Sequence, residues 1–313
     1  MYGGIHISSD DLVGCRLGVR IGLEGFLKAH AMRSDVRDRG GLVNVSTRGV
    51  SGSGERVLIA GFVVGNGEPQ EVLVRTVGPN LERFGLPREQ CVPDPSLAVF
   101  RMGGGQEPLV ANYAWDASPQ SAAIVELGRA RGAFALDAGS GDAAEVLETT
   151  EGVFTVISSS GANEDRPLIQ LVEAYGQRLL NVSTRGFVGK DNAVLIAGFA
   201  LVGTEPTALL IRGIGPSLEP FGVATPLEDP VMHIYRIGPE GTAELVAGND
   251  DWSDDPRASL AEVSAANVGA FPLDQATRDA ALFVQLMPGT YTVTLSGKAG
   301  TEGVGLVEVY HVR

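Results

Sequence analysis

Short apolar runs separated by turn-forming residues predict β-strands along most of the chain. In the C-terminal half, "AVLIAGFAL" and "TALLIRGIG" have strand length, and the turn-rich "VGTEP" separates them. "AALFVQLMPGTYTVTLSG" is typical of two strands around a Pro-Gly turn, while "VMHIYRI" and "GVGLVEVYHV" alternate as strands do. Only "DDPRASLAEVSAANVG" has a helical pattern, with Asp254 or Asp255 able to cap it and Pro256 near its first turn.

The strand pattern occurs twice because the chain contains an internal repeat. "NVSTRG" stands at positions 44–49 and again at 181–186, which is 137 positions later. "VLVRTVGPNLERFG" from Val72 matches "LLIRGIGPSLEPFG" from Leu209 at the same offset. A fixed period of this length indicates duplication of a whole domain-sized unit.

The repeat divides the chain into a leader at 1–41, repeat 1 at 42–176 and repeat 2 at 177–313. About eight short strands and one short helix in each repeat predict an all-β fold. We therefore expect two tandem antiparallel β-sandwich domains of jelly-roll-like form, each with one short helix. Trp115 and Trp252 are expected in equivalent positions.

Composition and charge narrow the class of protein. Among 313 residues, 44% are hydrophobic, and this apolar content suffices for two cores. The 42 Gly and 17 Pro are too few for a disordered chain. A formal charge of −14 repels phosphate backbones, so we do not expect nucleic acid as a partner. The sequence contains no run of 18 apolar residues, so we expect no membrane span, and no signal peptide is visible.

The leader contains an unpartnered amphipathic strand. Leu17, Val19, Ile21 and Leu23 alternate with Arg and Gly in "RLGVRIGLEGF". Three interpretations stay open. The strand pairs with an edge strand of repeat 1, or it adds to the sheet of a neighbouring molecule and forms a filament. In the third, the leader is disordered or is an artefact of the chosen start of the sequence.

The two cysteines lie outside the repeated framework. Cys15 stands in the leader, and Cys91 aligns with Pro226 of repeat 2. A disulfide between leader and repeat 1 is one interpretation, and two free thiols are the favoured one.

Repeat 2 also resembles a known family. Its run "EDPVMHIYRIGPEGTAELVAGNDDW", followed by "LMPGTYTVTLSGKAGTEGVGLVEVY", resembles the pre-peptidase C-terminal type of β-sandwich. The whole unit is similar to uncharacterised tandem repeats at the ends of large secreted bacterial proteins. The resemblance covers both repeats and not the leader. It implies an exported, extracellular or cell-surface accessory module that is not itself catalytic.

An acidic cluster in repeat 2 is the candidate metal site. Its members are Asp229, Asn249, Asp250, Asp251, Asp254 and Asp255. Calcium takes six to eight oxygen ligands in a flexible shell, so these residues predict a calcium site although their spacing differs from that of an EF-hand. The alternative, which we favour, is an Asp-rich turn that caps a helix. The matching loop of repeat 1 keeps only Asn112 and Asp116.

Catalytic motifs are missing from the sequence. The four histidines have no counterparts between the repeats, and no G-x-S-x-G elbow, H-E-x-x-H or P-loop is present. Arg75 and Arg212 recur in register, and within a strand each lies either on the wet face or buried against a carboxylate. A shared anion or sugar site is a third interpretation of these arginines.

Two function classes follow. The leading hypothesis is a non-catalytic extracellular β-sandwich module for adhesion, assembly or structural support of a larger secreted or surface protein. Its partner would be a protein or a cell-surface glycan, with self-association through the leader strand as a further option and no cofactor other than calcium. The alternative is a hydrolase with a site assembled on one sandwich, which requires a concave pocket that gathers Ser, His and acidic groups.

Overall fold

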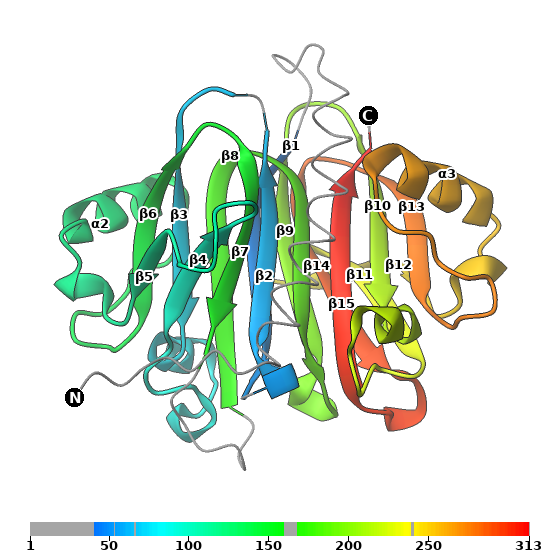
Figure 1. The fold of residues 1–313 in the computed structure, drawn as a ribbon, viewed down its shortest axis with the longest axis horizontal. Coiled ribbons are helices and arrows are strands. Elements are labelled where there is room, and N and C mark those ends of the chain that lie inside the picture. Colours follow the sequence, from blue (N-terminus) through cyan, green and yellow to red (C-terminus); the bar gives the residue numbers. More distant parts are fainter. Residues whose placement is uncertain (1–40, 53, 66, 160–167, 239–240, 313) are drawn as a thin grey trace.

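The strands and helices follow in the same order in both repeats (Figure 1). The structure, a computed structural model, describes residues 41–52, 54–65, 67–159, 168–238 and 241–312. Repeat 1 contains β1 (Gly41–Ser51), β2 (Leu58–Val64), β3 (Gln70–Val77), β4 (Leu97–Arg101), β5 (Val110–Asn112), α2 (Ser121–Ala130), β6 (Ala143–Thr149) and β7 (Gly152–Ser158). β8 (Leu168–Val188) closes repeat 1 and opens repeat 2. Repeat 2 continues with β9 (Leu195–Val202), β10 (Thr207–Ile214), β11 (Pro230–Ile237), β12 (Ala243–Asn249), α3 (Ala258–Val268), β13 (Ala280–Leu286), β14 (Gly289–Gly297) and β15 (Gly303–His311).

This architecture confirms the predicted all-β class, with antiparallel strands and one α-helix in each repeat. The strand β12 was not predicted from the sequence; five of its seven residues are exposed and none is buried. The helix α3 begins four residues after Asp254. Asp255 forms a turn just before it, where its carboxylate accepts the N–H of Arg257 at 2.7 Å.

The predictions for the leader lie outside the described residues, including the alternating strand of residues 17–23 and the pairing of Cys15. The strand β1 includes Gly41, the first of the described residues. Cys91 is a buried free thiol.

The first strand of each repeat pairs with its own repeat on one side and with the other repeat on the other side. β1 pairs with the first half of β8 in repeat 1, where Ser46 lies opposite Glu173, and with β9 of repeat 2, where Ser46 lies opposite Gly198. The second half of β8 pairs with β15 of repeat 2 and with β2 of repeat 1, where Ser183 lies opposite Gly61. Both copies of "NVSTRG" are therefore edge strands of their own repeat that also pair with an edge strand of the other repeat.

This edge-to-edge pairing joins the sheets of the two repeats into two long layers of antiparallel strands, and each layer runs through both repeats. One layer follows the order β6, β3, first half of β8, β1, β9, β14, β11, β12. The other follows β13, β10, β15, second half of β8, β2, β7, β4, β5. Because β8 passes from one layer to the other, hydrogen bonds link all fifteen described strands into one network.

The repeated glycine of "IAGF" is explained by the pairing between the repeats. A Cβ at Gly61 would lie 2.4 Å from the Ser183 hydroxyl, and a Cβ at Gly198 would lie 3.4 Å from the Ser46 Cβ. Each glycine therefore makes room for the neighbouring strand of the other repeat.

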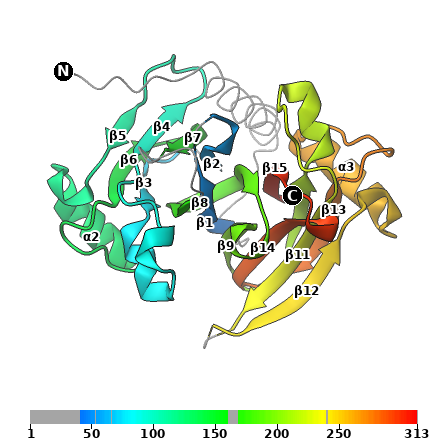
Figure 2. The ribbon, with the colours of Figure 1, turned by 90° about the horizontal axis from the view of Figure 1, so that it is seen from below.

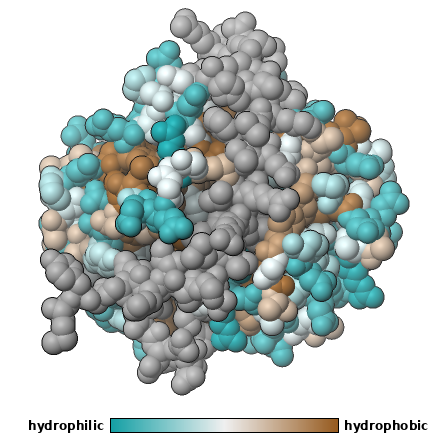
Figure 3. Space-filling view, in the orientation of Figure 1, coloured by the Kyte–Doolittle hydropathy of each residue, from teal (hydrophilic) through white to brown (hydrophobic). Residues whose placement is uncertain are grey.

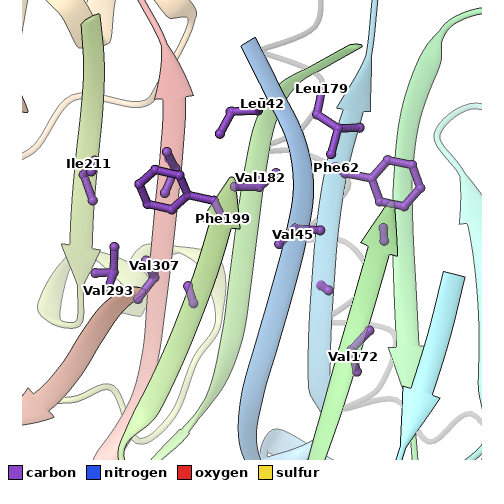
Figure 4. Packing of buried hydrophobic residues seen from close by; sticks show 14 of the residues in the cluster. Leu42, Val45, Phe62, Val172, Leu179, Val182, Phe199, Ile211, Val293 and Val307 are labelled. Atoms are coloured by element: carbon purple, nitrogen blue, oxygen red, sulfur yellow. The ribbon is translucent and has the colours of Figure 1, made fainter. Parts of the chain in front are cut away.

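The core is shared as well. One buried cluster contains Val45 and Phe62 from repeat 1 together with Phe199 and Val293 from repeat 2 (Figure 4). These side chains point into the space between the layers, since strand residues alternate between faces. Burial of apolar area on this scale is the main favourable term in folding, so the shared core makes the two repeats one folded body.

The two helices lie at opposite outer ends of the molecule (Figures 1 and 2). Around Ile124 of α2, a small cluster includes Leu73 and Trp115, and around Ala261 of α3 the matching cluster includes Leu210. In the described ranges, no helix combines the length and apolarity that crossing a membrane requires.

Candidate functional site

A buried polar cluster occurs on β3 and β8 of repeat 1. Arg75, which is 2% exposed, donates from Nε to Glu173 Oε2 at 2.9 Å and from Nη1 to the carbonyl of Phe134 at 2.5 Å. Tyr175 donates its hydroxyl to Glu173 Oε1 at 2.6 Å, and the guanidinium lies 4.3 Å from the centre of the Phe134 ring. The arginine is therefore held by a carboxylate, a carbonyl and an aromatic face.

Repeat 2 builds the same cluster. Arg212 donates to Glu308 Oε2 at 2.8 Å and to the carbonyl of Phe271 at 2.6 Å, and Tyr310 donates to Glu308 Oε1 at 2.7 Å. Of the interpretations offered for the repeated arginines, burial against a carboxylate is thus the right one. The signal was present in the sequence, because the Glu and Tyr of "LVEAY" and "LVEVY" recur 135 positions apart, close to the 137 positions that separate the arginines.

Burial and neighbouring charges set the protonation of two members of these clusters. Burial lowers the pKa of Arg212, but Glu308, Tyr310 and Asp279 together outweigh burial, and the pKa is raised. Burial and the neighbouring Glu173 carboxylate raise the pKa of Tyr175 well above its ordinary value. Arg212 therefore stays charged and Tyr175 stays neutral, as suits a structural element.

A second repeated polar element fixes the "GP" turn that follows β3 and β10. Asp142, fully buried, accepts the N–H of Gly78 at 2.8 Å, and Asp279 accepts that of Gly215 at the same distance. A Cβ at Gly78 would lie 1.9 Å from the carbonyl oxygen of Val92, so no other residue fits there without movement.

The two tryptophans are equivalent, as predicted. The indole N–H of Trp115 donates to the carbonyl of Asp137, and that of Trp252 donates to the carbonyl of Asp274, both at 3.2 Å. Both side chains are buried. The polar positions that recur between the repeats thus serve to hold the fold.

The predicted calcium ligands lie among cations. Asp229 is 2.7 Å from the guanidinium of Arg278, and Asp250 is 2.8 Å from the ammonium of Lys298. Asp251 lies 3.9 Å from the same ammonium. The hydrogen bond from Lys298 lowers the pKa of Asp250, so the carboxylate is charged and already paired.

The remaining predicted ligands have structural contacts. Asn249 accepts the N–H of Ala281 at 3.0 Å, as Asn112 accepts that of Ala144 in repeat 1. Asp255 forms the turn before α3, and Asp254 is exposed. Across the described part of the chain, no three His, Cys, Asp or Glu side chains gather so as to hold a metal ion. Calcium binding by this loop stays a prediction.

A cavity of about 300 Å³ opens beneath α3. Leu210 of β10 and Ala281 of β13 form its floor, Ala261 and Ala265 of α3 form its roof, and Trp252 lines one side. Two charged residues, Arg212 and Glu262, also line it, and the set contains neither Ser nor His. The outer face of α3 exposes further apolar residues, which Figure 3 shows on the side where α3 lies.

The cavity was not predicted from the sequence, although the repeat contains a signal for it. At the position of Ala261, repeat 1 has Ile124, which is 4% exposed and packs against the sheet. Alanine therefore occupies less space under α3 at this position than isoleucine occupies under α2.

Comparisons with known proteins name no relative for this chain. No family model matches, and no curated protein matches. Among solved structures, the major capsid protein P2 of bacteriophage PM2 is 11% identical over 88% of this chain and 98% of its own, with a TM-score of 0.19. A DUF4785 family protein of Legionella pneumophila is 10% identical over 89% of this chain and 85% of its own, with a TM-score of 0.20. Neither likeness bears on function, and the resemblance to pre-peptidase C-terminal repeats stays a prediction.

Proposed function

We propose that this chain is a non-catalytic, extracellular structural module that gives a larger secreted or surface protein a stiff, two-repeat body. The pairing of β1 with β9, and of the second half of β8 with β2, across the boundary between the repeats is the observation that carries this proposal. One repeat cannot open without exposing the core of the other, because Val45 and Val182 on these edge strands belong to the shared cluster. A load on either repeat is therefore carried by both.

The two ends of the described body lie beside β8, where the repeats pair with each other. Leu42 near the start of β1 pairs with Leu179, and Tyr310 near the end of β15 pairs with Asn181, two positions further along β8. A pull on the two ends therefore acts on strands that are hydrogen-bonded to β8. Binding to a protein or a cell-surface glycan, and assembly through self-association, are part of the same proposal.

Stretching the full chain between handles attached near positions 41 and 312 tests the proposal. We expect a single unfolding event that releases about 95 nm, the extended length of both repeats together. Two separate events of about 48 nm each would contradict a shared load-bearing body.

A parallel assay with ester, peptide and glycoside substrates tests the alternative of a hydrolase. We expect no turnover above the uncatalysed rate. Turnover that co-purifies with the folded chain and disappears when it is unfolded would overturn the non-catalytic assignment.

A further inference from the structure

We propose that the cavity beneath α3 binds a small, uncharged, largely apolar molecule of one or two rings that carries one hydrogen-bond acceptor. This site goes beyond the structural role and does not depend on it. The proposal rests on the volume of the cavity, on its lining and on the comparison with repeat 1.

The volume suits a ligand of this size. An apolar cavity of about 150 Å³ holds one benzene ring, and ordinary ligand pockets begin near 300 Å³. At about 300 Å³, the cavity has room for roughly two fused rings. Its walls are mostly alanine, leucine and the Trp252 indole, so a ligand would gain affinity chiefly by leaving water.

The lining also selects the charge of the ligand. Arg212 has five N–H donors, and the structure assigns three hydrogen bonds to them, to Glu308 and Phe271. The charge of the guanidinium is already balanced by Glu308, which is fully buried. Glu262 on the exposed side of α3 adds negative charge at the cavity, so an anion would be repelled. A neutral carbonyl or ether oxygen is the acceptor that fits Arg212.

Repeat 1 offers a comparison for the cavity. It keeps the Arg–Glu–Tyr cluster, the tryptophan and the helix, and Ile124 of α2 packs against Leu73 and Trp115. Ala261 stands at the position of Ile124 in repeat 2 and lines the cavity, so the chain supplies its own matched substitution at this position.

The test uses the full chain and 2-acetylnaphthalene, a neutral bicyclic ketone, with tryptophan fluorescence as the readout. We expect one site per chain, and we expect Ala261→Ile, which copies repeat 1, to weaken binding at least tenfold. Ala261→Val, a milder filling of the same space, should weaken it less and covers the case in which the isoleucine variant does not fold. Ile124→Ala should open the matching space and raise the stoichiometry from one to two.

Absence of binding to the unmodified chain would overturn the proposal. So would binding that is equally strong in folded Ala261→Ile or Ala261→Val, because the probe would then lie elsewhere on the surface.

Discussion

The hydroxyl groups of Thr47 and Thr184 lie 2.6 Å apart at the centre of the molecule, although 137 residues separate them in the chain. Both side chains are buried. They occupy the same position in the two copies of "NVSTRG", so each is the counterpart of the other in the repeat. Their contact marks the approximate two-fold axis that relates the two repeats.

Substitution of both of these threonines should cost less than the sum of the two single substitutions. Thr47→Val or Thr184→Val alone leaves a buried hydroxyl without its partner, which we expect to lower the free energy of unfolding by about 1–3 kcal/mol. The double variant replaces both polar groups by methyl groups of similar shape, so its cost should be smaller than the sum of the single costs. Urea denaturation of the four proteins measures the coupling. Additive losses would show that the two hydroxyls do not pair.

Stability should fall at high pH through Tyr175. Its pKa is raised by burial and by Glu173, so the folded state keeps the proton while the unfolded tyrosine ionises near pH 10. The contribution is fully present below the unfolded pKa and is lost as pH rises above about 10, at up to about 1.4 kcal/mol per pH unit. Denaturation of the native chain and Tyr175→Phe from pH 8 to 11 measures the difference between their slopes. Equal slopes would refute the shift.

Calcium binding by the loop between β12 and α3 can be decided by chelation. If the loop binds calcium, removal of calcium with EDTA lowers the melting temperature, and Asp250→Ala with Asp251→Ala removes that effect. A Kd one hundredfold below the free calcium concentration corresponds to about 2.7 kcal/mol. Lys298→Gln is the matched control, because it removes the ammonium that now pairs with Asp250 and should strengthen any calcium binding. If EDTA leaves the melting temperature unchanged in all of these proteins, the loop does not bind calcium.

Neither repeat should be stable as a monomer by itself. A fragment of residues 41–176 lacks the partner of β2 that the second half of β8 supplies, and a fragment of residues 177–313 lacks the partner of β9 that β1 supplies. We expect each fragment to self-associate or aggregate, and the mixture to form a one-to-one complex. Sedimentation of the fragments separately and together measures this. Folded, monomeric fragments would contradict the shared core.

Much of the fold could be predicted from local pattern. The apolar runs of β9, β10, β13 and β14 are buried strands, and a buried strand needs such a run. The pairing between the repeats could not be predicted in this way, because "NVSTRG" has the same pattern whether or not it also pairs with a strand of the other repeat. The choice depends on contacts between distant residues, such as Gly61 against Ser183.

The candidate sites divide in the same manner. The acidic run at Asp250 was visible, but its pairing with Lys298, 48 residues away, depends on the tertiary structure. The cavity beneath α3 depends on a small residue, Ala261, that has no chemical signature by itself. Only comparison with Ile124 in the other repeat reveals it.

Edge-to-edge strand pairing between the repeats is the central claim, and amide-to-amide nuclear Overhauser effects in the deuterated full chain test it most directly. This pairing predicts cross-strand contacts between the neighbourhoods of Ser46 and Gly198, and of Ser183 and Gly61. If "NVSTRG" of each repeat paired with its own "IAGF" strand, contacts would instead link Ser46 to Gly61 and Ser183 to Gly198. The first set of contacts is the result we predict, and the second set would contradict the joined body.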